Sequence, residues 1–132
     1  MTDDSEQVRW HSEAIAAEAE AALATLRNAS LLENFYLAGG TGLALRFGHR
    51  LSRDLDFFAS QAFDEERLLQ ALRELPGFSL TATAPQTLHA IVQETKVSFL
   101  GYPYPVLFPS SRYREVAVAD PRDIACMPRR QA

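Results

Sequence analysis

The chain has 132 residues, of which 47% are hydrophobic and 23% charged, and its formal net charge is −4. These values are typical of one globular domain with a modest core, and the negative charge argues against nonspecific binding along a nucleic-acid backbone. Cys126 is the only cysteine, which excludes an intramolecular disulfide and favours a reducing compartment. The sequence has no apolar run long enough for a membrane span and no signal-peptide pattern, so we expect a cytoplasmic protein.

The first third of the chain predicts two helices separated by a short buried strand. Residues 5–28 carry apolar side chains at helical spacing among alanines and glutamates, with Ser5 as a candidate N-cap. The strand is predicted at residues 34–38, where a pair of glycines ends it. The second helix is predicted at residues 41–47 and stops at Gly48.

A second strand, Asp-Leu-Asp-Phe-Phe, is predicted at residues 54–58. Asp54 and Asp56 should lie on one face of it, because strand side chains alternate between the two faces of a sheet. The next helix is predicted at residues 63–75, capped by Asp64 and ended by a Pro-Gly pair.

The rest of the chain predicts mainly strands. Three prolines exclude regular structure across residues 101–111, and Asp120 followed by Pro121 signals the start of a last helix. The strand-like runs are residues 78–83, 87–93, 95–101 and 115–118. This order predicts an α/β (α+β) fold, a single domain over residues 1–132 in which helices flank a mixed sheet. The glycine turn and the Asp-x-Asp then converge at one edge of the sheet, where a ligand is expected.

A Gly-Gly-Thr turn joins the first strand to the second helix. Gly39 and Gly40 would let backbone N–H groups approach an anion closely, and the helix N-terminus adds a partial positive charge. Thr41 could donate its hydroxyl to the same phosphate. The alternative is a tight turn that needs a positive φ at one glycine, and the motif by itself favours this alternative.

The Asp-x-Asp shifts that balance. Asp54 and Asp56 repel each other, and burial beside aromatic residues raises the cost of both charges. A divalent cation removes the penalty, and Mg²⁺ takes one or two carboxylates together with substrate phosphate oxygens. The alternative is a pair of solvated aspartates, one of them paired with Arg50 or Arg53. An Asp-x-Asp 12 residues beyond a Gly-Gly-Thr turn is a more specific signal, and it favours a site for Mg²⁺ (or Mn²⁺) with a substrate phosphate.

The segment FYLAGGTGLALRFGHRLSRDLDFF closely resembles the signature of the nucleotidyltransferase AbiEii/AbiGii toxin family, within the polymerase-β-like nucleotidyltransferase superfamily. A looser resemblance continues through KVSFLGYPYPVL and VADPRDIACM. It implies a toxin of a type IV toxin–antitoxin or phage-defence system that transfers a nucleotidyl group to a hydroxyl acceptor, on tRNA or protein, and that meets an antitoxin protein. The residues implied for the triphosphate are Gly39, Gly40 and Thr41. The residues implied for catalysis and for the metal are Asp54 and Asp56.

Three further residues are candidates near the phosphates: Ser52, Arg53 and Lys96. Ser52 could cap the strand or orient Asp54. Arg53 and the neighbouring Arg46 and Arg50 could neutralise phosphate charge, or they could be surface arginines that neutralise the charge of nearby aspartates. Lys96 could reach a phosphate or be an exposed edge lysine. The three histidines show no metal-ligand spacing, and none is assigned to the site.

The chain departs from the family pattern in two places. The superfamily usually has a third carboxylate where this chain has Ser98, and family members continue beyond Met127 with a lysine and an acidic helix. We therefore expect a chain that lacks the C-terminal helical part, binds nucleotide with little transfer, and self-associates through apolar surface near Ile124. Two alternatives stay open: an inactive remnant that acts as a nucleotide- or protein-binding module, and a sugar-nucleotide glycosyltransferase, for which the chain is short.

Overall fold

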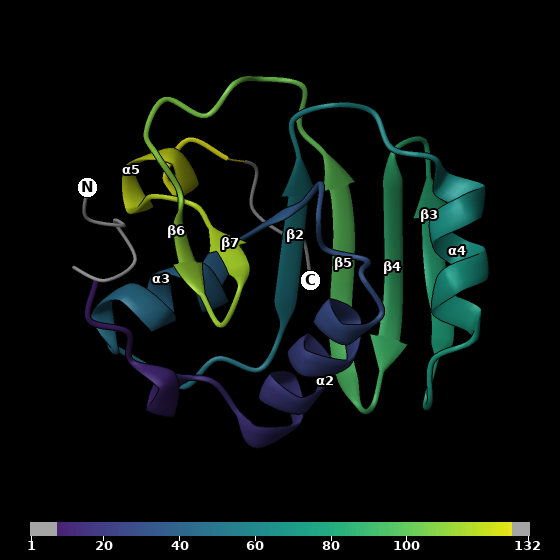
Figure 1. The fold of residues 1–132 in the computed structure, drawn as a ribbon, viewed down its shortest axis with the longest axis horizontal. Helices are drawn as coiled ribbons and strands as arrows, with labels where there is room; N and C mark the ends of the chain where they lie inside the picture. Colours follow the sequence, from purple (N-terminus) through teal and green to yellow (C-terminus); the bar gives the residue numbers. More distant parts are fainter. Residues whose placement is uncertain (1–7, 128–132) are drawn as a thin grey trace.

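The computed structural model describes residues 8–127, and within them seven strands form one mixed sheet with the order β3-β4-β5-β2-β1-β7-β6 (Figure 1). The strands are β1 (Tyr36–Ala38), β2 (Leu55–Ala59), β3 (Ser79–Ala84), β4 (Thr87–Val92), β5 (Thr95–Gly101), β6 (Ser111–Tyr113) and β7 (Val116–Val118). The helices are η1 (Ser12–Ala14), α2 (Ala17–Asn28), α3 (Gly39–Phe47), α4 (Glu65–Arg73) and α5 (Pro121–Ile124). The mixed α/β architecture predicted from the sequence is confirmed.

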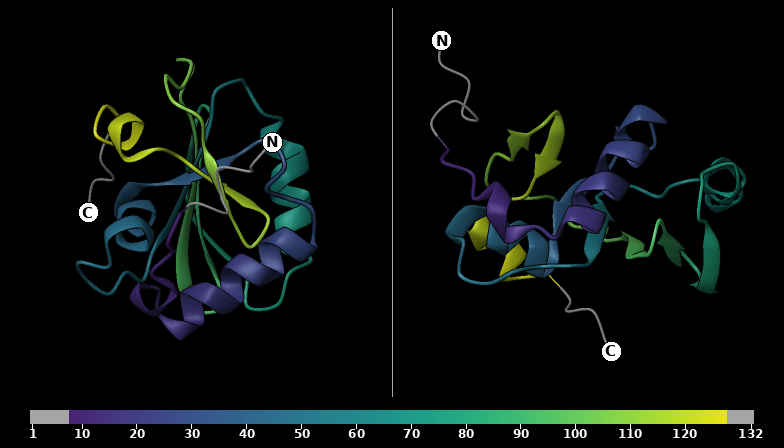
Figure 2. Two further views of the ribbon diagram at one scale, coloured as in Figure 1. Left: turned by 60° about the vertical axis from the view of Figure 1, so that its left-hand side comes forward. Right: turned by 90° about the horizontal axis from the view of Figure 1, so that it is seen from below.

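The two faces of the sheet are covered by different helices (Figure 2). On one face, apolar residues of α2 and α4 pack with alternate residues of the central strands into the main core. On the other face a smaller cluster brings α5 and the flank of α3 against β1 and β2. Within residues 8–127, no helix has the length and apolar character needed to cross a bilayer.

The predicted helix over residues 5–28 is wrong in its first part. The described chain forms only the short η1 there, and Ile15 and Ala16 are extended before α2 begins. Ile15 bridges to Ser52, and the N–H of Ala16 donates to the carbonyl of Ser52 at 2.9 Å. This long-range pairing overrides the helix propensity of the segment. Ser5, the candidate N-cap, lies outside the described residues.

Other element predictions differ from the structure in detail. β2 begins at Leu55, so Asp54 lies just before the strand rather than in it. The cap of α4 is confirmed, since Asp64 accepts a hydrogen bond from the N–H of Arg67 at 3.1 Å. Strand β6 was missed, because the prolines that precede it mask a short strand that forms only by pairing with β7.

The expected apolar surface near the end of the chain is also wrong. Ile124 is 7% exposed and Met127 is 8% exposed, and both pack with Phe58 and Ala119 in the smaller cluster. These two residues therefore offer no uncovered surface for self-association.

Candidate nucleotide and metal site

The glycine turn and the Asp-x-Asp meet at one end of the β1–β2 pair. These strands are antiparallel, and Ala38 lies opposite Asp56. Gly39 follows Ala38, has a φ of +62°, and packs so closely on Asp56 that a Cβ there would lie 2.6 Å from the carboxylate Oδ2. Only glycine tolerates both that backbone conformation and that approach. The predicted convergence of the two motifs is therefore seen at Gly39 and Asp56.

The second glycine lies against a guanidinium group. The Nη2 atom of Arg50 occupies the space where a Cβ on Gly40 would sit. Arg50 is an exposed residue of the segment between α3 and β2, so its side chain reaches back over the start of α3. This places a positive charge beside the backbone N–H groups of the glycine turn.

The two aspartates differ in their surroundings. Asp56 belongs to β2 and is 7% exposed, whereas Asp54 is half-buried and precedes the strand. Strand alternation therefore does not by itself place the Asp54 carboxylate beside that of Asp56. Their joint role as metal ligands stays a prediction.

Thr41 and Ser52 form a buried hydroxyl pair under this site. Thr41 is 2% exposed and donates to the backbone carbonyl of Asp54, and its oxygen is hydrogen-bonded to the Ser52 hydroxyl. Because a hydroxyl carries a single proton, Ser52 is the donor to Thr41. The chain of bonds ties the first turn of α3 to the approach of β2, so both residues hold the backbone of Asp54 in place. A contact of the Thr41 hydroxyl with a phosphate stays a prediction.

Sequence reasoning missed a row of polar residues across three strands. Asp56 on β2 lies opposite Ser98 on β5, and Ser98 lies opposite His89 on β4. Their strand neighbours belong to the main core, so the three share the opposite face of the sheet. Ser98 is fully buried, and its hydroxyl lies 2.7 Å from Nδ1 of His89.

The register of the β4–β5 hairpin produces this row. Gln93 and Glu94 both have positive φ, 48° and 68°, and form the two-residue turn between β4 and β5. A hairpin closed by two residues at that point pairs His89 with Ser98. The two residues therefore come together through the register of the hairpin, which the spacing of histidines alone does not reveal.

The remaining candidates lie in different places. Lys96 is exposed and shares the strand face of Ser98, so its reach toward a phosphate stays a prediction. Arg53 lines a separate small cavity with Glu94 and Thr95, among others, and its predicted phosphate contact is likewise untested.

Arg46 has a structural role in this arrangement. Its Nη2 donates to the carbonyls of Val118 and Ala119, each at 3.1 Å, and its guanidinium lies 5.0 Å from the centre of the Trp10 ring. Burial lowers the pKa of Arg46, although nearby Asp120 opposes the shift. These contacts tie α3 to β7 and leave the charge of Arg46 engaged within the fold.

The carboxylates near the glycine turn are sufficient ligands for a divalent cation only if oxygens of a substrate phosphate complete its coordination shell. Within residues 8–127, no group of three or more histidine, cysteine, aspartate or glutamate side chains is arranged to hold a metal ion. Mg²⁺ needs fewer protein ligands when phosphate oxygens complete its shell, and one or two carboxylates then suffice. Asp54 and Asp56 are the two carboxylates predicted to serve in this way, and the metal site stays a prediction.

A mixed sheet in which a glycine turn opens a helix and an Asp-x-Asp lies at the start of the neighbouring strand is consistent with a nucleotidyltransferase domain. The chain belongs to the nucleotidyl transferase AbiEii toxin family of type IV toxin–antitoxin systems, whose model matches residues 21–124. It is similar to the uncharacterized protein aq_aa25 of Aquifex aeolicus (strain VF5), with 33% identity over 114 residues that cover 83% of this chain and 55% of that protein.

Two crystal structures from Helicobacter pylori are also similar. JHP933 shares 17% identity at a TM-score of 0.50, over 83% of this chain and 55% of that chain. A candidate nucleotidyltransferase shares 17% identity at a TM-score of 0.49, over 83% of this chain and 56% of that chain. The first likeness supports the fold, and this chain spans about half the length of the relatives it matches.

Proposed function

We propose that this chain binds a nucleoside triphosphate together with Mg²⁺ or Mn²⁺ and transfers a nucleotidyl group to a hydroxyl acceptor on tRNA or protein, as the toxin of a type IV system with an antitoxin partner. The observation that carries the proposal is the contact of the Asp56 carboxylate with the backbone of Gly39. It brings the proposed metal ligand and the proposed phosphate-binding turn together.

The phosphate side of the site rests on α3 and Arg50. The N-cap residue of α3 is Ala38, which provides no side-chain hydrogen bond to the nine-residue helix. The backbone N–H groups of its first turn are therefore suited to phosphate oxygens, and the helix dipole favours negative charge there. Arg50 beside Gly40 adds a guanidinium that can bind phosphate with two parallel hydrogen bonds.

The carboxylate side rests on Asp54 and Asp56. The pair Thr41 and Ser52 fixes the backbone of Asp54, and Asp56 lies in β2, so the two proposed metal ligands belong to one short segment. A bound divalent cation would neutralise the phosphates and activate the acceptor hydroxyl. The residues of the chain contribute position and charge rather than covalent chemistry.

A second function, nucleotide binding without transfer, is favoured by one observation. The place beside Asp56, where the family resemblance implies a third acid, holds the neutral and fully buried Ser98, whose hydroxyl is bonded to His89. A serine adds no charge for metal or acceptor. Such a chain would act as a nucleotide- or protein-binding module.

Thermal unfolding with Mg²⁺ and each of the four nucleoside triphosphates tests the site. A ligand at about 100 times its Kd adds about 2.7 kcal/mol to the free energy of unfolding. Asp54→Asn and Asp56→Asn should each abolish this gain, because the metal loses a charged ligand. Asp64→Asn is the matched control, since it makes the same change at the cap of α4, where asparagine serves equally well.

Equal ligand-induced shifts in the parent and in Asp56→Asn would refute the site. Incubation with nucleotides labelled on the α-phosphate, followed by separation of tRNA and protein fractions, distinguishes the two functions. Label that enters either fraction with the parent, but not with Asp56→Asn, supports transfer. Binding without label incorporation supports the second function.

A further inference from the structure

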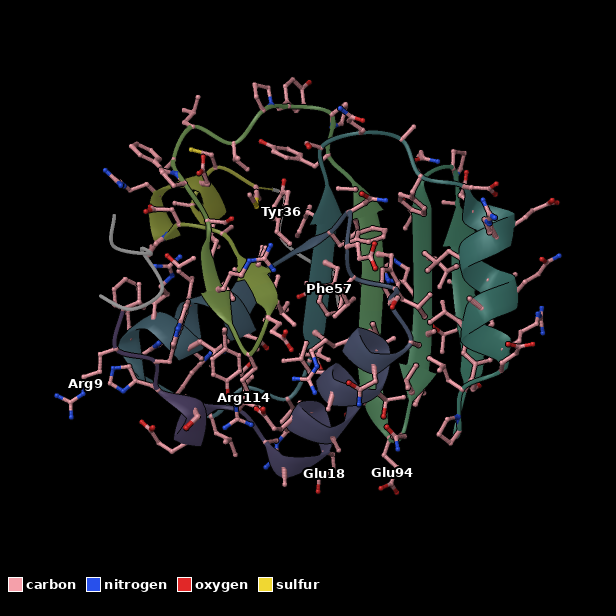
Figure 3. All side chains as sticks on the ribbon, in the orientation of Figure 1. Arg9, Glu18, Tyr36, Phe57, Glu94 and Arg114 are labelled. Carbon is pink, nitrogen blue, oxygen red and sulfur yellow. The ribbon has the colours of Figure 1, made fainter. Side chains whose placement is uncertain are left out.

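A row of polar side chains leads away from the proposed metal ligand Asp56. The ring of Phe57 lies on the face of the sheet that α2 covers (Figure 3), so Asp56 lies on the opposite face. On that face Ser98 of β5 is opposite Asp56, and His89 of β4 is opposite Ser98. The imidazole turns toward β5, since its Nδ1 lies 2.7 Å from the Ser98 hydroxyl oxygen. The ring of His89 is therefore directed along the row toward Asp56.

The His89 end of the row is open to a substrate. On this face the helices α3 and α5 pack on β1 and β2, away from β3 and β4 (Figure 1). The outward side chains of β4, among them His89, are half-buried, and all those of β3 are exposed, whereas Ser98 is fully buried. An acceptor that approaches Asp56 over β4 therefore meets the imidazole rather than the serine.

The spacing of the strands leaves room for the reacting group of an acceptor. Neighbouring strands lie about 4.8 Å apart, so β2 and β4 are separated by about 10 Å, with the small side chain of Ser98 between them. A hydroxyl group seated over Ser98 would be within hydrogen-bonding reach of the imidazole on one side. On its other side it would lie next to Asp56.

The proposed transfer needs a group that takes up a proton. As the acceptor oxygen bonds to the α-phosphorus, the bond from that phosphorus to the β-phosphate oxygen breaks, and pyrophosphate leaves with the electron pair. The proton of the acceptor hydroxyl passes to a base, which in enzymes is most often a histidine. Ser98 is neutral, and a carboxylate that binds a cation is a weak base. His89 is the remaining basic side chain of the row.

The neighbours of Ser98 indicate which nitrogen of the ring is basic. A hydroxyl group donates one hydrogen bond and accepts others, whereas a carboxylate only accepts. The proton of the Ser98 hydroxyl is attracted toward Asp56, one strand away, so its oxygen is left to accept from Nδ1–H of His89. A neutral imidazole carries a single proton, and Nε2 then keeps a free lone pair.

We propose that Nε2 of His89 takes the proton of the acceptor hydroxyl during nucleotidyl transfer, and that Ser98 is the positioning residue that holds the ring. This inference rests on the proposed function, because it needs a nucleotide and an acceptor beside Asp56. It gives the chain a base next to Asp56, although a serine stands where the family resemblance implies a third acid.

The position of the ring proton is testable without any ligand. Long-range ¹H–¹⁵N correlation spectra of the ¹⁵N-labelled chain, recorded where imidazole is ordinarily neutral at about pH 8, distinguish the two tautomers. The signals of His89 are those that His89→Gln removes. We expect the Nδ1–H tautomer. The Nε2–H tautomer would overturn the proposal, since the nitrogen available to the acceptor would already carry a proton.

Transfer of label from nucleotides labelled on the α-phosphate to the tRNA and protein fractions tests the role in the reaction. Glutamine at position 89 keeps a donor for Ser98 but has no basic nitrogen. His89→Gln should therefore keep the rise in Tm caused by Mg²⁺ and nucleotide, and it should transfer about a hundredfold more slowly than the parent. His11→Gln is the matched control, because it makes the same change at a histidine bonded only to Glu13 among the printed side-chain contacts, and it should transfer as the parent does.

Chemical rescue separates a base from a structural residue. Imidazole added to His89→Ala should raise its transfer rate by about tenfold or more, whereas pyrazole, a much weaker base of the same shape, should not. Parental transfer by His89→Gln, or a loss that imidazole does not restore, would overturn the role of His89 while the proposed function stands. Absence of label with the parent would overturn the transfer itself, and this inference with it.

Discussion

Replacing Gly39 by alanine should damage the proposed site through a single methyl group. An alanine at a φ of +62° costs about 1–2 kcal/mol relative to glycine, because its Cβ crowds the following carbonyl. The same Cβ would lie 2.6 Å from Oδ2 and 3.1 Å from Cβ of Asp56, so the carboxylate must rotate away from α3. With this displacement included, we expect a loss of about 2–3 kcal/mol, which lowers the Tm of a domain of this size by roughly 8–12 °C.

Gly48→Ala is the matched control for this substitution. Gly48 ends α3 with a φ of +63°, and a Cβ there would lie 2.6 Å from Nδ1 of His11. It therefore carries the same backbone penalty and displaces a neighbouring side chain, the more exposed ring of His11, but it does not contact Asp56. Both variants should lose similar stability without ligand.

The two variants should differ when Mg²⁺ and a nucleoside triphosphate are added. Gly48→Ala should keep the full ligand-induced rise in Tm, measured by differential scanning fluorimetry, because its site is intact. Gly39→Ala should show little or no rise, since both the phosphate turn and the Asp56 carboxylate have moved. A parental rise in Gly39→Ala would refute the reasoning that this contact organises the site.

Two further predictions concern buried polar groups. His89→Ala removes the partner of the buried Ser98 hydroxyl and should lower the free energy of unfolding in urea by about 1–2 kcal/mol. Adding Ser98→Ala to the same chain should restore most of this loss, and additive losses would contradict the hydrogen bond between the two side chains. Burial raises the pKa of Tyr36 to about 12, so the folded state holds this proton more tightly than the unfolded state does. The contribution of the protonated hydroxyl to the free energy of unfolding is therefore fully present below pH 10 and is lost as the pH rises toward 12. Tyr36→Phe should therefore raise the midpoint of alkaline unfolding followed by circular dichroism, and it should cost little at pH 7 because the Tyr36 hydroxyl has no hydrogen-bond partner among the described residues. Tyr113→Phe, by contrast, should cost about 1 kcal/mol at pH 7 because it loses a 3.0 Å hydrogen bond to Glu20, and equal behaviour of the two variants at pH 7 would be inconsistent with this difference.

The local features of the site could be predicted from the sequence alone. The pair Gly39 and Gly40 indicates a turn that opens a helix, and the run from Asp54 to Phe58 indicates a strand, because both depend on residues adjacent in the chain. The cap at Asp64 is equally local, since it depends on a hydrogen bond three residues away. These features also carried the family resemblance, and the family match over residues 21–124 confirms it.

Contacts between segments remote in sequence were decided by the tertiary structure. Ile15 leaves the predicted helix because it pairs with Ser52, and Ile124 is buried because α5 folds back onto the sheet. Strand register puts His89 beside Ser98 and Ser98 beside Asp56, which no periodicity in the sequence states. Helix and strand patterns specify which face of an element is apolar, whereas the partner of each polar group depends on which elements become neighbours. The sequence thus determined most of the elements and the motifs of this protein, and the packing of its sheet decided which side chains meet.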